Sequence, residues 1–114
     1  MHRFILYRSG GYIRGFQASG HADSDSPTGD VVCNGVSALT QTAVLSAHQL
    51  VPIPEDQLKV GQRDGYLYLW ILKGHEKPET QTILESMMVG LREIEKNYSK
   101  FLKISIQEVD HDPF

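Results

Sequence analysis

The chain has 114 residues, of which 40% are hydrophobic and 22% are charged, and its formal net charge at pH 7 is −3. This length suits one domain over residues 1–114, and the composition provides for a single buried core and excludes wholesale disorder. A net negative charge without a cluster of Lys or Arg argues against direct binding of nucleic acid.

The single cysteine, Cys33, excludes an internal disulfide framework and points to a reducing compartment. The N-terminus runs directly into strand-like sequence. It has neither the apolar stretch of a signal peptide nor a segment long enough to cross a membrane. We therefore expect a soluble, cytoplasmic protein with no membrane partner.

The N-terminal region is predicted to form a β-hairpin. Residues 3–8 and 12–18 are rich in β-branched, aromatic and apolar residues, and Ser9-Gly10-Gly11 between them suits a tight turn. The second strand would bring Gly20 and His21 to the edge of the sheet.

A polar loop over residues 22–29 separates this hairpin from a predicted helix. Asp30 is a typical helix N-cap residue, which would make Val31 the first helical position and place Cys33 in the first turn. Apolar residues at helical spacing extend the helix to about Leu50, before two prolines end it.

The rest of the chain repeats the pattern of a hairpin followed by a helix. The Asp64-Gly65 pair marks the second hairpin turn, and a proline suits the first turn of the second helix. In chain order we predict strands over residues 58–61 and 66–72, a helix over residues 78–97, a strand over residues 101–109 and a frayed tail over residues 110–114.

The predicted order of elements is β-β-α-β-β-α-β. Strands outnumber helices and occur in hairpins, which is typical of the α+β class. We expect a single domain with a mixed sheet and two helices packed on one face.

Cys33 is the strongest candidate for a reactive group. In the first turn of a helix, the partial positive charge of the N-terminus would favour thiolate over thiol. His21, twelve residues earlier, would act as its general base if the ring comes within hydrogen-bond reach. The alternatives are structural: a lone cysteine can be a small buried hydrophobe, and His21 a hydrogen-bonded residue at a strand end. Spacing alone leaves both interpretations open.

Two further polar residues could support such a pair. Asp30 as a cap would fix the helix end that carries the sulfur. Ser37 follows Cys33 by one turn, on the same helix face, where it either supports the pair or bonds back to a carbonyl of its own helix. No separate Asn or Asp stands out as a third member to orient His21.

At these residues the chain resembles a known family. Gly20-His21-Ala22, Asp30-Val31-Val32-Cys33 and Val36-Ser37-Ala38 are similar to the signature of the ribosomal-processing cysteine protease Prp family, and the spacings between His, Asp and Cys match as well. The resemblance extends over essentially the whole chain in length and element order. Departures are the absence of a tyrosine between residues 23 and 29, and Asn34-Gly35 where small residues such as alanine are common.

The resemblance implies a specific activity. Members are small bacterial cysteine endopeptidases that remove a short N-terminal extension from large-subunit ribosomal protein twenty-seven during ribosome maturation, and they form homodimers. Carried over, Cys33 is the nucleophile and His21 the base, with Gly20, Asp30 and Ser37 in support. The mobile loop over the site would comprise Ala22, Asp23, Ser24, Asp25, Ser26, Pro27, Thr28 and Gly29.

The expected chemistry is acyl transfer through a thioester, and we expect neither a cofactor nor a metal. Backbone N–H groups at the start of the Cys33 helix would serve as oxyanion donors. The substrate would bind as an added strand along a sheet edge.

Two other classes stay open. One is a non-catalytic, ribosome-associated binding module in which Cys33 is inert. The other is a small thiol-dependent acyltransferase or hydrolase that acts on thioesters or esters. The reactivity of the thiol distinguishes the binding module from the enzymes.

Overall fold

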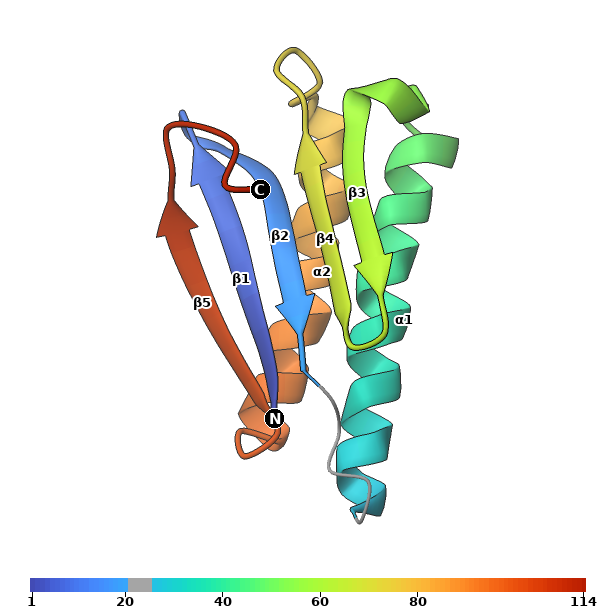
Figure 1. Ribbon diagram of the computed structural model, residues 1–114, viewed down its shortest axis with the longest axis vertical. Helices are drawn as coiled ribbons and strands as arrows, with labels where there is room; N and C mark the ends of the chain where they lie inside the picture. The colour runs from blue at the N-terminus through green and yellow to red at the C-terminus, as the bar shows by residue number, and fades with distance from the viewer. Residues whose placement is uncertain (21–25) are drawn as a thin grey trace.

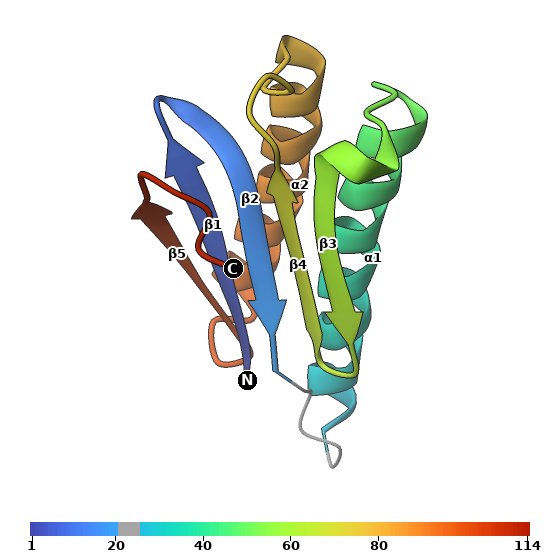
Figure 2. The ribbon, with the colours of Figure 1, turned by 45° about the horizontal axis from the view of Figure 1, so that its top comes forward.

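A five-stranded sheet carries two long helices on one of its faces (Figures 1 and 2). The computed structural model describes residues 1–20 and 26–114, and its elements follow the predicted order. They are β1 (His2–Ser9), β2 (Tyr12–Ser19), α1 (Pro27–Gln49), the short 3₁₀ helix η1 (Glu55–Gln57), β3 (Leu58–Arg63), β4 (Tyr66–Ile71), α2 (Pro78–Asn97) and β5 (Leu102–Glu108).

The sheet is mixed, as predicted. Its strand order is β3-β4-β2-β1-β5, so β3 and β5 form the two edges. The pair β1 and β5 is parallel, whereas the other neighbours are antiparallel. The prediction of an α+β fold with both helices on one face is therefore confirmed.

Side chains alternate between the two faces of the sheet, and those that point toward the helices form the core. The aromatic rings of Phe4 on β1 and Phe16 on β2 stack with their centroids 5.3 Å apart. The helices supply the opposite wall. The buried core cluster consists of Phe4, Leu6, Ile13, Phe16, Ala18, Val32, Val36, Ala43, Leu67, Leu69, Ile71, Leu84, Met87, Met88, Leu91 and Leu102.

The two helices pack closely at Gly35. Gly35 lowers the intrinsic helix propensity of α1 by about 1 kcal/mol relative to alanine. A Cβ atom at Gly35 would lie 3.1 Å from Ile94 Cδ1 on α2, a tight contact. The missing side chain therefore lets α1 approach α2. No helix in the described part of the chain is long and apolar enough to cross a membrane.

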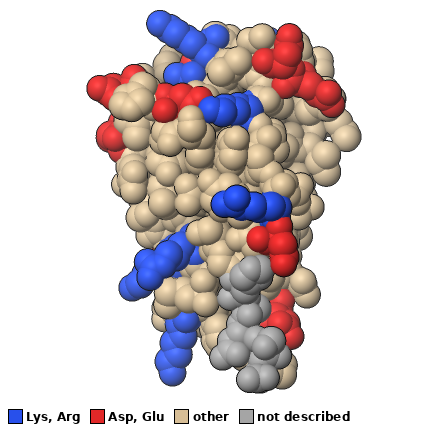
Figure 3. Space-filling view, viewed as in Figure 1, with Lys and Arg blue, Asp and Glu red and all other residues tan. Residues whose placement is uncertain are grey.

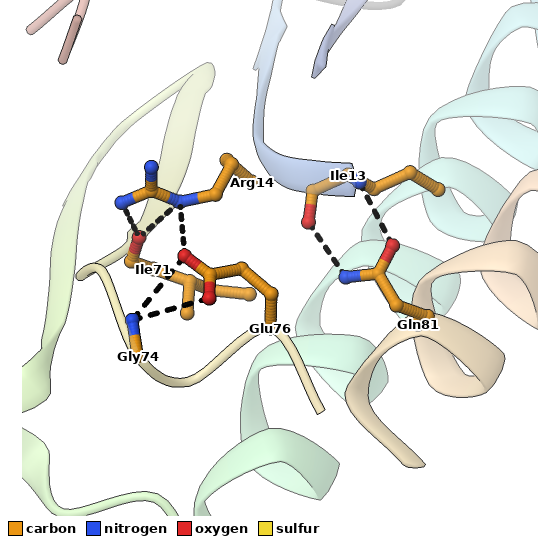
Figure 4. Close-up of polar contacts among 6 residues, drawn as sticks. All are labelled: Ile13, Arg14, Ile71, Gly74, Glu76 and Gln81. Carbon is orange, nitrogen blue, oxygen red and sulfur yellow. Dashed lines mark hydrogen bonds and ion pairs between the residues drawn. The ribbon is translucent and has the colours of Figure 1, made fainter. Parts of the chain in front are cut away.

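Polar side chains of Arg14, Glu76 and Gln81 hold the end of the sheet where β2 begins (Figure 4). The register between β1 and β2 shifts there, and the Arg14 guanidinium donates from Nε and Nη2 to the carbonyl oxygen of Ile71 at 2.9 and 2.6 Å. Arg14 Nε also lies 3.3 Å from Glu76 Oε1. On α2, Gln81 bonds both backbone groups of Ile13, at 2.8 and 2.9 Å. These contacts lie at one end of the sheet, and the candidate site lies at the opposite end.

The prediction that residues 110–114 fray is wrong. The face of the sheet that carries no helix is aromatic, and the tail packs against it. Phe114 stacks on Tyr68 with ring centroids 4.1 Å apart and meets Tyr7 edge-on at 5.4 Å. Tyr7 is only 6% exposed, and burial raises the pKa of its hydroxyl above the ordinary value, with Tyr66 adding to the shift.

Polar contacts fix the same tail to β3. Lys59 Nζ lies 3.0 Å from Asp112 Oδ2 and donates to the carbonyl oxygen of Phe114 at 2.9 Å. Figure 3 looks onto this face, where charged side chains gather toward the ends and uncharged ones fill much of the area between.

We expect Phe114→Ala to lower the free energy of unfolding by about 1–2 kcal/mol, because it removes a half-buried ring and two aromatic contacts. Urea unfolding followed by circular dichroism measures the change. Tyr12→Ala, which truncates an aromatic side chain that is 48% exposed, is the control. Equal losses in the two variants would show that the tail does not stabilise the fold.

Candidate active site

Helix α1 begins earlier than the sequence predicted. Ser26 is the N-cap, and its Oγ accepts a hydrogen bond from the Gly29 amide at 3.1 Å. Pro27 occupies the first helical position, where its fixed φ is favourable and its missing N–H costs nothing. The predicted Asp30 cap is therefore wrong, since Asp30 is the fourth helical residue and is exposed.

Because α1 begins at Pro27, Cys33 lies beyond the first turn of the helix. It is the seventh residue of α1, whereas the favourable field of a helix N-terminus falls off within about one turn. The first four amides of a helix are those left without a helical acceptor, and Cys33 lies beyond them. The predictions that the helix start activates the thiol and supplies oxyanion donors beside it therefore lose their geometric basis.

Three residues of the predicted mobile loop belong to α1 instead. Pro27, Thr28 and Gly29 are helical rather than loop residues. His21, Ala22, Asp23, Ser24 and Asp25 lie outside the described residues.

Cys33 sits at the border of the buried stripe of α1. Its neighbour Val32 is in the core, 2% exposed, whereas Cys33 itself is a free, half-buried cysteine. Ser37 and Gln41 follow at intervals of four on the same helix face, and Gln41 Nε2 donates to Ser37 Oγ at 3.4 Å. The thiol therefore has both an apolar side and a polar side.

This side of α1 opens into a hollow of about 330 Å³ beside the end of the sheet. Four segments of the chain form it: the start of β1, the end of β2, the middle of α1 and the turn between β3 and β4. Of the predicted site residues, Cys33, Gly20 and Ser37 line the hollow and Asp30 does not. The full lining comprises His2, Ala18, Ser19, Gly20, Cys33, Val36, Ser37, Thr40, Gln41, Gln62, Arg63, Asp64, Gly65, Tyr66 and Leu67.

Gly20 fixes the point where the chain leaves the sheet toward His21. Its amide donates to the carbonyl oxygen of Gly65 at 2.9 Å, which ties the end of β2 to the β3–β4 turn. Its φ of +115° is a conformation that other residues rarely adopt, and a Cβ atom there would lie 2.3 Å from the carbonyl oxygen of Met1. No other residue fits this position without moving the N-terminus.

The β3–β4 turn is the part of the site that sequence reasoning missed. The sequence predicts only a hairpin turn at Asp64-Gly65, yet Arg63, Asp64 and Tyr66 line the same hollow as Cys33. The Arg63 guanidinium lies over the Tyr66 ring, 4.9 Å from its centroid. The turn thus brings one positive and one negative side chain to the site. No local pattern signals this, because the sheet topology alone brings the turn there.

Comparison with known proteins identifies the family of the chain. The family model described as cysteine protease Prp matches residues 1–103. The chain belongs to the cysteine protease Prp family. It is also 31% identical over 96 residues to the ribosomal processing cysteine protease Prp of Bacillus subtilis, which covers 82% of this chain and 85% of that protein. The predicted family is thus confirmed, and the chain is a cysteine protease of the ribosomal-processing type.

Solved structures share the fold. The essential ribosomal processing protease Prp of Staphylococcus aureus, in complex with a substrate peptide, superposes with a TM-score of 0.81 at 23% identity and covers 94% of this chain and all of that one. A Streptococcus mutans protein gives a TM-score of 0.77 at 23% identity, with 96% of both chains covered.

The helix start can be tested by a pair of cap variants. We expect Ser26→Ala to lower the free energy of unfolding by about 1 kcal/mol, because the amide of Gly29 loses its acceptor, and Asp30→Ala by only about 0.3 kcal/mol. Chemical unfolding of both variants measures the difference. A larger loss for Asp30→Ala would restore the cap that the sequence predicted.

The Gly20 junction can be tested against a second glycine. Gly10 also has a positive φ, but a Cβ atom there would meet nothing within 4 Å. We therefore expect Gly10→Ala to cost about 1 kcal/mol, from backbone strain alone, and Gly20→Ala about 3 kcal/mol or more, because it adds a collision with backbone. Equal losses would mean that the contact with Met1 is easily relaxed.

Proposed function

We propose that this chain removes the N-terminal extension from the precursor of large-subunit ribosomal protein twenty-seven, with Cys33 as nucleophile and His21 as general base. The observation that carries the proposal is the position of Cys33 in the hollow. A cysteine protease needs a cysteine nucleophile, and the chain has one cysteine. That cysteine is half-buried and lines a hollow large enough for part of a peptide.

The reaction proceeds by acyl transfer. His21 takes the proton of the Cys33 thiol, and the thiolate attacks the scissile carbonyl carbon. As the C–N bond breaks, the proton passes from His21 to the departing amine, and a thioester to Cys33 remains. His21 then takes a proton from water, whose oxygen attacks the thioester carbonyl carbon. The C–S bond breaks, the extension is released as a carboxylic acid that ionises in water, and His21 returns its proton to the Cys33 sulfur.

The surroundings of Cys33 support this role. The β3–β4 turn brings Arg63, Asp64 and Tyr66 to the lining of the same hollow, where their side chains can contact a bound peptide. The apolar residues Val32 and Val36, 2% and 3% exposed, fix the helix face that carries the sulfur. Rigid placement of a nucleophile lowers the entropic cost of attack.

The remaining parts of the proposal concern partner, compartment and assembly. The Bacillus subtilis relative is named for ribosomal processing, and Staphylococcus aureus Prp is solved with a substrate peptide and with a covalently linked product peptide. For this chain we propose the ribosomal protein precursor as partner, action in the cytoplasm and a homodimeric state, with no direct contact to nucleic acid and no membrane partner.

The test is cleavage of a peptide that spans the extension, by wild type, Cys33→Ala and His21→Ala, with mass spectrometry of the products. We expect one cut by wild type. In both variants we expect kcat/KM to fall by at least about a thousandfold, as removal of a nucleophile or its base does in other proteases.

Thr42→Ala is the control, because it removes an exposed hydroxyl from the same helix at a position that does not line the hollow. It should retain most of the activity. Cleavage by Cys33→Ala at the wild-type rate would contradict the proposal. If folded wild type cuts neither the peptide nor the full-length precursor, the binding-module alternative is favoured.

A further inference from the structure

Two hollows lie along the free edge of β3, and the first is the Cys33 hollow. In both ribbon views β3 is the outermost strand on the side of the sheet where α1 lies (Figures 1 and 2). At the far end of this edge is a second hollow of about 270 Å³, lined by Val44, Leu45, His48, Glu55, Leu58 and Val60. This hollow is largely apolar, unlike the one at Cys33.

The same two elements line both hollows in order. On α1, Cys33, Ser37 and Gln41 line the first, and Val44 and His48 the second, all on one face of the helix at intervals of three or four residues. On β3, alternate residues do the same: Gln62 lines the first hollow, and Val60 and Leu58 line the second. The two hollows therefore lie in line between α1 and β3, and together we call them the groove.

The backbone of β3 faces outward at these positions. The Leu72 amide donates to the carbonyl oxygen of Gln57 at 3.1 Å, which fixes the phase of the β3–β4 ladder. Because backbone groups alternate in direction along an antiparallel strand, the N–H and C=O groups of Val60 and Gln62 point away from β4. Among residues 1–20 and 26–114, β3 pairs with β4 only. An extended chain therefore finds a row of donors and acceptors beside the apolar hollow.

We propose that this groove is a specificity subsite for an extended apolar segment of the substrate, which adds to β3 as a further strand. The inference rests on the proposed protease function. Backbone bonds to Val60 and Gln62 give affinity, and apolar side chains of the peptide enter the space between Val44, Leu45 and Val60. Leu45 and Val60 are 55% and 43% exposed, so a peptide would cover apolar surface that is now in water.

The groove sets the distance between the subsite and the scissile bond. Val44 follows Cys33 by eleven positions, or about 16 Å along the helix. A strand spans this in about five residues, at roughly 3.3 Å per residue. The bound apolar side chains should therefore lie about four to six residues from the cut. At the far end, His48 Nε2 and Glu55 Oε1 lie 3.8 Å apart and make the groove polar.

The test measures peptide binding independently of catalysis. In a Cys33→Ala background, we would measure the Kd of two labelled peptides by fluorescence anisotropy: the whole extension, and a short peptide with three residues on each side of the cut. We expect the whole extension to bind at least roughly tenfold more tightly, because the added backbone bonds and apolar contacts contribute only to that peptide.

Two substitutions should remove this difference. Val60→Pro deletes an outward N–H on an edge strand, a position that tolerates proline, and Leu45→Asp puts a charge into the apolar hollow. Each has a matched control away from the groove. Ile106→Pro makes the same change on the other edge strand. The Val109 amide bonds to β1 and the Ile104 amide bonds away from it to Glu95, so the amide of Ile106 also points outward. Val89→Asp charges an exposed position on α2.

The outcomes separate the two proposals. Loss of the tenfold preference in Val60→Pro and Leu45→Asp, but not in the controls, supports the subsite. An unchanged preference, or an equal loss in all four variants, overturns it. If the otherwise wild-type enzyme cuts neither peptide while the Cys33→Ala protein shows the groove-dependent preference, the protease proposal fails and the groove stands as a binding surface. If neither peptide is cut or bound, both proposals fall.

Discussion

The site depends on one junction, where Gly20 lies between the N-terminus and the β3–β4 turn. The amide of Gly20 bonds to Gly65, and the carbonyl oxygen of Met1 occupies the space that a side chain would need. This contact brings three chain segments to the same end of the sheet, and α1 closes the fourth side. A hydrogen bond and a steric constraint at one glycine thus determine where the chain leaves the sheet, and with it the shape of the hollow that Cys33 lines.

Local sequence patterns predicted the elements of the fold but not all of their ends. Alternation and glycine turns were enough to give the strands, and Pro78 marked the start of α2 correctly. At α1 the structure begins the helix with Ser26 and Pro27, although the composition of residues 22–29 is typical of a loop and Asp30 is also a typical cap residue. The tail is predicted to fray because chain ends are often poorly ordered. Phe114 is ordered by Tyr7 and Tyr68, which lie about a hundred and about fifty residues away, and local patterns cannot show such contacts.

The candidate site was predictable to the same extent. Cys33 stood out because the chain has no other cysteine, and its helical spacing to Ser37 follows from geometry alone. Arg63 and Asp64 were not identified because only the strand order β3-β4-β2 places their turn opposite α1. The same strand order leaves β3 at an edge of the sheet beside α1. The hollow at Cys33 and the proposed subsite therefore both depend on how β3 and its turn lie against α1.

The measurement that tests the central claim most directly is detection of the covalent intermediate. Enzyme and the extension peptide are mixed, quenched in acid during turnover and digested, and the peptide that contains Cys33 is examined by mass spectrometry. The account predicts an adduct on Cys33 whose added mass is that of the released extension minus one water, and no such adduct in Cys33→Ala. Product formation without an adduct at Cys33, or with an adduct at another residue, would contradict it.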